Sequence, residues 1–285
     1  MAVAAATVGS VVLFAAPAYA ATSVFKSGAS IVVNATQGHA NNITLRQVGA
    51  NLLISDTGDV MSPGLNCFVS GNSIACPLGA QDTVVVNAGD LNDTITKLAN
   101  VRGNLKGESG NDTINGGTSP GSNILDGGSG TDRLNGGSTF DFLIGGPGAD
   151  RISGGGSTGD LASYTLSTSR VIVDLDGVAD DGSTGEGDNV LADVEGVYGS
   201  QFNDVITGNA AANVLAGFGG NDTFFGGAGN DVLAGFQGDD SLFGQAGDDT
   251  LDTVDQVAGN DLTDGGTNID TCRTDLNDRR VSCEH

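Results

Sequence analysis

Apolar residues recur every nine positions along the middle and the C-terminal half of the chain. Counted from Gly199, successive units read GSQFNDVIT, GNAAANVLA, GFGGNDTFF, GGAGNDVLA, GFQGDDSLF and GQAGDDTLD. The same phase holds over residues 127–153, and GESGNDTIN (107–115) precedes it, separated by one eleven-residue unit. Six consecutive units in strict phase predict a solenoid built from one repeated supersecondary unit.

The units share the template G-G-x-G-x-D-x-U-x, in which U is a large apolar residue. Glycine accepts positive φ and allows close backbone approach, so we expect a turn over the first six positions. The last three positions predict a very short strand whose middle side chain points inward. The expected core is a stack of the side chains at position U, namely Ile114, Leu125, Leu134, Leu143, Ile152, Ile206, Leu215, Phe224, Leu233, Leu242 and Leu251.

Aspartates follow the same period. Two units make one coil of 18 residues, and Asp204, Asp222 and Asp240 lie 18 residues apart, on one edge of the expected solenoid. Stacked turns bring carboxylate and carbonyl oxygens into repeated gaps, which suit a hard cation such as calcium. The alternative is an acidic solvated surface without ions, which repulsion between stacked carboxylates opposes.

These nonapeptides resemble the haemolysin-type (RTX) calcium-binding repeat over about half of the chain, from residue 107 to residue 270 with one interruption. The resemblance implies an all-β fold, a right-handed parallel β-roll, with several Ca²⁺ ions between turns. In that family, the aspartates and the backbone carbonyls of the loops hold the ions. The implied metal ligands are Asp112, Asp132, Asp141, Asp150, Asp204, Asp222, Asp231, Asp240, Asp249, Asp261 and Asp270. The implied turn glycines are Gly107, Gly110, Gly127, Gly128, Gly130, Gly145, Gly146, Gly148, Gly217, Gly220, Gly226, Gly227, Gly229, Gly235, Gly238, Gly244 and Gly247.

Several units depart from the template. Asp141 and Asp204 lack the fourth glycine, and Asn123 and Asn213 replace the aspartate, which predicts weaker binding. Asp261 and Asp270 resemble the ligands of a final irregular coil, in which Cys272 takes position U.

The breaks in the period predict the domain organisation. We expect a small N-terminal β cap domain over residues 21–98, roll blocks over 99–153 and 199–252, an extended coil over 154–198, and a C-terminal cap over 253–285. Strand-like runs lie at 30–34, 43–48, 52–55 and 83–87, and residues 89–95 resemble a degenerate first repeat. Asp188 and Glu195 are candidate ion ligands in the extended coil, where a solvated loop is the alternative.

Residues 1–20 have the features of a signal peptide, an apolar run that ends in Ala18-Tyr19-Ala20, although no basic residue precedes the run. We expect cleavage after Ala20 and a secreted, extracellular chain without a membrane span, with an uncleaved anchor as the alternative. Four cysteines in an exported chain predict disulfides, and close spacing favours Cys67–Cys76 and Cys272–Cys283. A zinc site is disfavoured, because CxxC is absent and only two histidines occur.

The charge excludes further classes. The 285 residues contain 35 acidic and 11 basic residues, a net charge of −24, which excludes a nucleic-acid binder and an anionic-membrane binder. High net charge favours disorder, but the 38% apolar content is periodic.

Catalytic signatures are weak. HExxH is absent, and both GxSxG sequences (117–121 and 155–159) lie in repeat turns. We therefore expect a non-catalytic secreted calcium-binding protein that folds on binding, with a structural, surface or matrix role. Cell-surface or matrix glycans or proteins are candidate partners besides calcium, and an adhesin is one such reading. The alternative is a calcium-dependent hydrolase or lytic toxin whose active part is residues 21–98.

Overall fold

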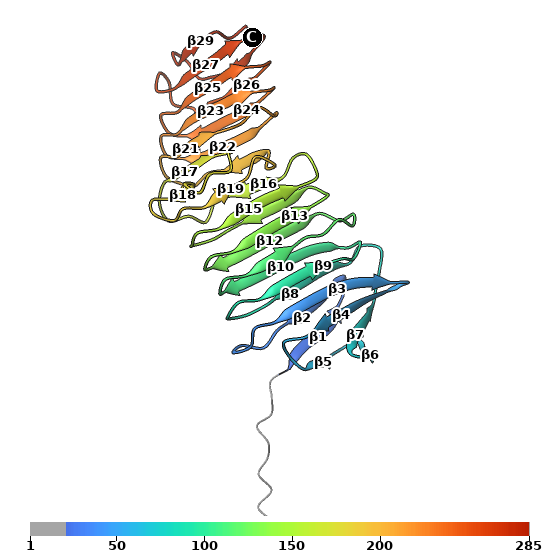
Figure 1. The fold of residues 1–285 in the computed structure, drawn as a ribbon. Helices are drawn as coiled ribbons and strands as arrows, with labels where there is room; N and C mark the ends of the chain where they lie inside the picture. Colours follow the sequence, from blue (N-terminus) through green and yellow to red (C-terminus); the bar gives the residue numbers. More distant parts are fainter. Residues whose placement is uncertain (1–20, 285) are drawn as a thin grey trace, which may run out of the picture.

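Residues 21–284 are described by a computed structural model, in which coils of β-strands stack into an elongated parallel β-solenoid (Figure 1). The all-β fold expected from the nine-residue period is confirmed. The expected signal peptide and its cleavage after Ala20 lie outside the described residues. Within the described residues, no helix is long and apolar enough to cross a membrane.

One wall of the solenoid is a single sheet that runs the length of the molecule. Its 13 strands, ordered from the C-terminal end, are β28 (Thr271–Arg273), β26 (Thr250–Asp252), β24 (Val232–Gln237), β22 (Val214–Gly219), β20 (Gly196–Tyr198), β16 (Leu161–Ser163), β14 (Asp141–Ile144), β12 (Asn123–Ser129), β10 (Arg102–Ser109), β8 (Thr83–Asn87), β2 (Ser30–Asn34), β1 (Thr22–Ser27) and β5 (Met61–Pro63).

The facing wall is divided into two sheets. The nine-stranded sheet contains β19 (Asn189–Val190), β15 (Arg151–Gly155), β13 (Arg133–Gly137), β11 (Thr113–Asn115), β9 (Thr94–Lys97), β3 (Asn42–Val48), β4 (Asn51–Asp56), β7 (Ser73–Pro77) and β6 (Phe68–Ser70). The seven-stranded sheet contains β18 (Gly182–Ser183), β17 (Val171–Asp174), β21 (Val205–Thr207), β23 (Thr223–Ala228), β25 (Ser241–Ala246), β27 (Leu262–Thr267) and β29 (Arg279–Val281).

The side chains at position U form the core between the walls. Parallel pairing places Leu215 beside Leu233, and Phe224 beside Leu242, one coil apart. Every side chain predicted for this stack is at most 1% exposed, and Cys272 continues it beside Leu251. The predicted core is therefore confirmed.

Four strands of the second block, β22 to β25, are longer than the predicted three residues, whereas β21 and β26 have three. β23 and β25 each have six residues, and their pairing extends to Gly227 with Gln245 and Ala228 with Ala246. A turn over six positions was therefore wrong. Adjacent coils have the same length, so their backbones stay in register beyond x-U-x and hydrogen-bond through the first three positions of the next unit.

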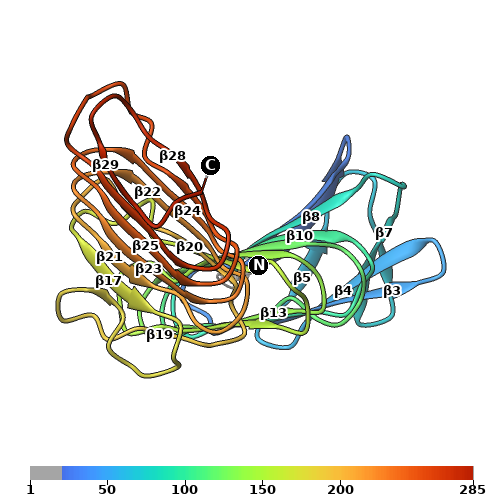
Figure 2. The same ribbon diagram turned by 90° about the horizontal axis from the view of Figure 1, so that it is seen from above.

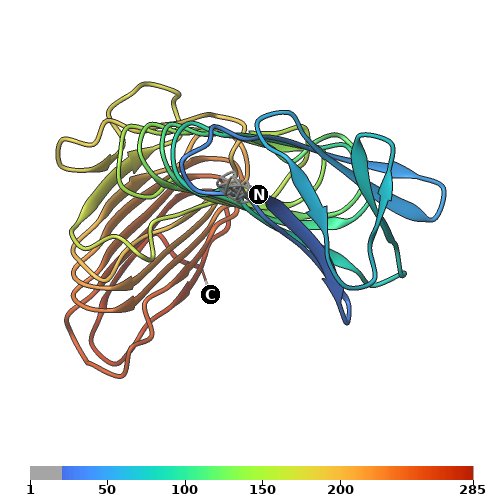
Figure 3. The same ribbon diagram turned by 90° about the horizontal axis from the view of Figure 1, so that it is seen from below.

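Between the two blocks, the solenoid continues and its axis bends. β16 and β20 keep the 13-stranded sheet unbroken, while β17 starts the seven-stranded sheet beside β21. Seen from above and from below, the C-terminal coils run at an angle to the N-terminal coils (Figures 2 and 3).

The N-terminal segment is continuous with the roll. β2 and β8 pair in parallel with each other and lead to β10, and β3 and β9 lead to β11. Four predicted strand-like runs correspond to β2, β3, β4 and β8. The antiparallel strands around them (β1, β4, β6 and β7) cover the end of the solenoid, so the expected cap is built upon two coils of the roll itself.

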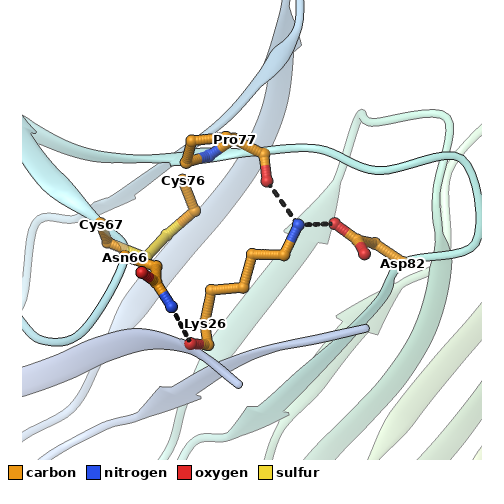
Figure 4. The surroundings of a disulfide bond; sticks show 6 residues. All are labelled: Lys26, Asn66, Cys67, Cys76, Pro77 and Asp82. Atoms are coloured by element: carbon orange, nitrogen blue, oxygen red, sulfur yellow. Dashed lines mark hydrogen bonds and ion pairs between the residues drawn. A yellow bond between two sulfur atoms is a disulfide. The ribbon is translucent and has the colours of Figure 1, made fainter. Parts of the chain in front are cut away.

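Both expected disulfides are present, Cys67–Cys76 and Cys272–Cys283, which leaves no free thiol for zinc among the described residues. Close to the first disulfide, the Lys26 ammonium donates to the Pro77 carbonyl and pairs with the Asp82 carboxylate (Figure 4). These contacts join β1 to the segment that follows β7.

Candidate metal centre

The repeat aspartates form hydrogen-bonded ladders along the edges of the solenoid. The backbone N–H of each aspartate donates to Oδ1 of the aspartate one coil further on, as from Asp222 to Asp240 (2.9 Å) and from Asp231 to Asp249 (2.8 Å). We name each ladder after the sheet whose strands follow it. The nine-strand ladder contains Asp93, Asp112, Asp132, Asp150 and Asp188; the thirteen-strand ladder Asn123, Asp141, Asp160, Asn213, Asp231, Asp249 and Asp270; the seven-strand ladder Asp204, Asp222, Asp240 and Asp261.

All eleven predicted ligands thus lie in ladders, and each is at most 3% exposed. Their second oxygen is the unusual feature. Within residues 21–284, Oδ2 is buried without a hydrogen-bond partner in Asp93, Asp112, Asp132, Asp141, Asp150, Asp222, Asp231, Asp240, Asp249, Asp261 and Asp270. A buried carboxylate oxygen without a partner is costly, and such a group in a native fold indicates a missing ion or water.

The first glycine of each unit leaves space beside this oxygen. A Cβ added at Gly226 would lie 2.4 Å from Asp231 Oδ2 and 2.8 Å from the Gly244 carbonyl oxygen. At Gly127, the corresponding atoms are Asp132 Oδ2 at 2.4 Å and the Gly145 carbonyl oxygen at 2.7 Å. Because glycine has no Cβ, the carboxylate oxygen and a carbonyl oxygen of the next coil can therefore both lie close to this backbone position.

The predicted turn glycines divide into two kinds. Those at the first position have no positive φ and are crowded by the aspartate of their own unit: Gly107, Gly127, Gly145, Gly217, Gly226, Gly235 and Gly244. The others adopt positive φ: Gly110, Gly128, Gly130, Gly146, Gly148, Gly220, Gly227, Gly229, Gly238 and Gly247. The first kind supplies space for the site, and the second shapes the turn.

This set of donors fits calcium. Calcium takes six to eight oxygen ligands, carboxylate and carbonyl, in adaptable geometry, whereas magnesium demands a near-ideal octahedron. Partnerless carboxylate oxygens that face backbone carbonyls across a glycine-lined space meet this requirement.

Burial raises the pKa values of several ladder carboxyls, Asp222 and Asp150 among them. The pKa of Asp222 is raised to about 8. Burial is the largest cause, the hydrogen bond from the backbone N–H of Asp204 lowers the pKa in part, and the charges of Asp240 and Asp204 raise it further. Asp150 also reaches a pKa of about 8, mainly by burial, with additional repulsion from Asp188 and Asp132. Without a cation, these ladders therefore hold part of their protons at neutral pH.

The pKa shifts predict opposite pH dependences with and without calcium. The folded metal-free chain binds more protons than the unfolded chain, so its stability is expected to fall as pH rises from about 4 to about 8. With calcium bound, protons compete with the metal, so stability should rise with pH over the same range. Circular dichroism of the metal-stripped chain, which reports its folded fraction, and thermal unfolding of the calcium-loaded protein, each at pH 5 and pH 8, measure the two dependences, and dependences of the same sign would contradict the assignment.

The ladder positions next to the insertion differ. Ser200 Oγ and N–H satisfy both oxygens of Asp204, Ser157 Oγ reaches both oxygens of Asp160, and Tyr164 Oη donates to Asp188. Hydroxyl groups thus donate to the second carboxylate oxygen, which has no hydrogen-bond partner at most other ladder positions. Glu195 accepts the N–H groups of Gly159 and Asp160, so it ends the first part of the thirteen-strand ladder.

Asp93 and Asp160 escaped the predicted ligand set, and Asp188 was predicted only as a candidate ligand of the extended coil. Asp93 lies in the degenerate repeat at 89–95, which signalled it, whereas Asp160 and Asp188 lie in the coil that breaks the period. Asp150 and Asp188 are 38 residues apart, so the 18-residue spacing could not join them. Asn123 and Asn213 lie in the ladder as expected.

A solenoid with glycine-lined carboxylate ladders is a repeat-built, cation-binding β-roll. A family model described as the RTX calcium-binding nonapeptide repeat matches four segments, residues 104–119, 126–158, 198–233 and 230–253. The repeat region of the chain is therefore an array of RTX calcium-binding nonapeptide repeats, and the resemblance seen in the sequence is confirmed. No curated protein matches the chain. The matched segments leave out the N-terminal coils and the insertion, although the ladders pass through both.

Proposed function

We propose that this chain is a secreted calcium-binding protein whose β-roll folds when Ca²⁺ binds between stacked turns. The observation that carries the proposal is the series of eleven ladder Oδ2 atoms that are buried without a hydrogen-bond partner. Calcium would balance the negative charge of these carboxylates and give the partnerless oxygens a ligand bond.

The chain's own residues determine how binding is coupled to folding. Stacked carboxylates repel one another across successive coils, which keeps the metal-free turns apart. Once the charges are neutralised, the coils approach and the side chains at position U become buried, so binding energy becomes folding energy. An affinity of about 10⁻⁴–10⁻³ M would suit an extracellular module.

A structural role outside the cell is part of the proposal. Disulfides persist in oxidising compartments, and both cysteine pairs of this chain are disulfide-bonded. The serines of the two GxSxG sequences are engaged in turn structure, since Ser119 donates to the Leu98 carbonyl and Ser157 to Asp160. These contacts support a scaffold or matrix component rather than a hydrolase, and a substrate screen of the secreted protein with and without chelator tests that part.

Calcium titration of the metal-stripped chain, followed by circular dichroism, tests the binding function. In Asp222→Asn, the isosteric amide removes one ladder charge, and we expect the titration midpoint to move to about tenfold higher calcium, or ~1.4 kcal/mol. In chelator, the same variant should keep or gain β signal, because it also removes repulsion.

Asp239→Asn is the matched control, because Asp239 lies exposed in the stacked turn of the next coil, beside Asp240. Its midpoint should stay within about threefold of wild type, since an exposed charge is screened by solvent. Identical midpoints for Asp222→Asn and Asp239→Asn, or an equal gain of β signal with magnesium, would count against the proposal.

A further inference from the structure

The net negative charge of the chain comes entirely from its C-terminal two thirds. Residues 21–106 contain five basic and five acidic residues, whereas residues 107–285 contain six basic and 30 acidic residues. The N-terminal coils are therefore neutral, and the repulsion that opposes folding of the metal-free roll is absent from them.

Lys97, at the end of β9, takes the place of a turn glycine. β9 pairs with β11 so that Thr96 lies beside Asn115, which puts Lys97 beside Gly116. By the same register, Gly116 is followed by Gly136 and Gly154 in the next coils. In this column, each glycine opens a turn of the thirteen-strand ladder, whereas the two coils that precede them carry Leu45 and Lys97.

The Lys97 side chain lies inside the solenoid and is 0% exposed. Its Nζ donates to the carbonyl oxygens of Ala99 (3.2 Å) and Gly121 (3.4 Å). Burial lowers the pKa of Lys97, and the charge of Asp141, a ladder carboxylate, opposes this by favouring the ammonium form. A positive charge held by turn carbonyls near a ladder carboxylate is the arrangement that calcium would have in later coils.

Neighbouring atoms support this arrangement. A Cβ added at Gly103 would lie 2.7 Å from Asn123 Oδ1 and 3.3 Å from Lys97 Cδ, so both side chains border one small space. At Asn123, the first position of this ladder, a neutral amide replaces the usual carboxylate. A coil that contains its own cation has no need of that charge.

The nine-strand ladder begins in a similar way. Asn41 is 2% exposed, and its Nδ2 donates to the carbonyl oxygens of Ala88 (2.9 Å) and His39 (3.0 Å). Its backbone N–H donates to Asp93 Oδ1 (2.6 Å). Both ladders therefore start from nitrogen donors of the protein that bind turn carbonyls.

We propose that Lys97 is a built-in cation at the start of the thirteen-strand ladder, and that residues 21–106 fold without calcium and template the calcium-dependent coils. This inference rests on the proposed calcium-dependent folding of the later coils. An apolar core (Ile31, Ile43, Leu45, Ile54, Val84), the Cys67–Cys76 disulfide and the Lys26–Asp82 ion pair stabilise the template by means other than metal. Its exposed parallel strand edges at β9 and β10 then offer the register for the next coil.

Hydrogen exchange of the full-length chain, read by mass spectrometry in calcium and in chelator, tests the template. In chelator, peptides from residues 21–106 should stay protected within about threefold of the calcium state, while peptides from 107–284 lose protection by more than about 100-fold. Loss of protection in both regions would overturn this inference and leave the proposed function standing. Protection of both regions in chelator would instead contradict the proposed function.

Lys97→Met removes the positive charge and keeps a side chain of similar length, so it distinguishes the effect of the charge from that of side-chain volume. Lys106→Met is its matched control. Lys106 is in the same stretch, but its side chain is 41% exposed and lies 3.9 Å from Asp126. In chelator, Lys97→Met should lose at least tenfold protection in peptides that cover β8 to β10, whereas Lys106→Met should change less than threefold. Equal protection in the two variants would exclude the role of Lys97. If Lys97→Met does not fold, hydrogen exchange of the wild-type chain in calcium and in chelator still tests whether residues 21–106 fold without calcium.

Discussion

Removing calcium from the folded protein is expected to unfold residues 107–284 and to increase the radius of gyration of the chain roughly twofold. This region holds 30 acidic and six basic residues, and its ladder carboxylates are stacked one coil apart with no cation between them. Repulsion then exceeds the gain from burying one apolar side chain in every nine residues. Small-angle scattering and circular dichroism before and after addition of chelator measure the change.

Readdition of calcium serves as the control, because a metal-coupled transition must be reversible, whereas aggregation or proteolysis is not. Sodium chloride at high concentration is a second control, since screening alone reduces repulsion without supplying ligand-specific charge. A metal-stripped sample that stays as compact and as heat-resistant as the calcium-loaded one would rule out coupled folding and binding.

Gly238→Ala is expected to be strongly destabilising in the second block. Gly238 has φ +138°, and an added Cβ would lie 1.7 Å from the carbonyl oxygen of Gly220 in the preceding coil. The obstacle is backbone, so the two coils must separate, which also disturbs the ladder between Asp222 and Asp240. Together with the strain at positive φ, we expect a loss of about 3 kcal/mol or more, or a decrease of about 10 °C in Tm. Thermal unfolding in saturating calcium measures it.

Two other glycines separate the causes. Gly185 has φ +89° with no heavy atom within 4 Å, so Gly185→Ala carries the conformational penalty alone, about 1 kcal/mol. Gly156 has no positive φ, and its nearest neighbour, the Gly137 carbonyl oxygen, lies 3.6 Å away, so Gly156→Ala should unfold like the wild type. If Gly238→Ala also melted like Gly156→Ala, close stacking of the turns would not be essential.

Within the repeats, most of the site was predictable because the information is local and periodic. A fixed spacing of 18 residues identifies which aspartates share an edge, and Asp222 and Asp240 do adjoin one another. The unit over residues 253–264 is three residues longer than the others, so the spacing there becomes 21 residues. Asp261 and Asp270 still follow Asp240 and Asp249 in the ladders, as predicted. The period also identified position U, even where a cysteine replaces leucine.

Outside the repeats, the period is lost and the prediction was correspondingly poor. β2 and β8 pair Ile31 with Val84 across 53 residues that contain a complete antiparallel cap, so no spacing rule connects them. Asp188 joins Asp150 in the same ladder only because the insertion leaves the roll and returns to it.

The amino-acid sequence alone determined the coil length, the buried stack, both disulfide pairs and the class of metal ligand, because each follows from residues that repeat or lie close along the chain. Only the tertiary structure decided where the solenoid begins, how far each strand extends, and which buried carboxylates are already satisfied by serine or tyrosine hydroxyls. It also placed the Lys97 ammonium inside the second coil, which no spacing in the sequence could predict. These features depend on which backbone segments pair across long intervals, and pairing is settled by the packing of the whole coil rather than by local preference.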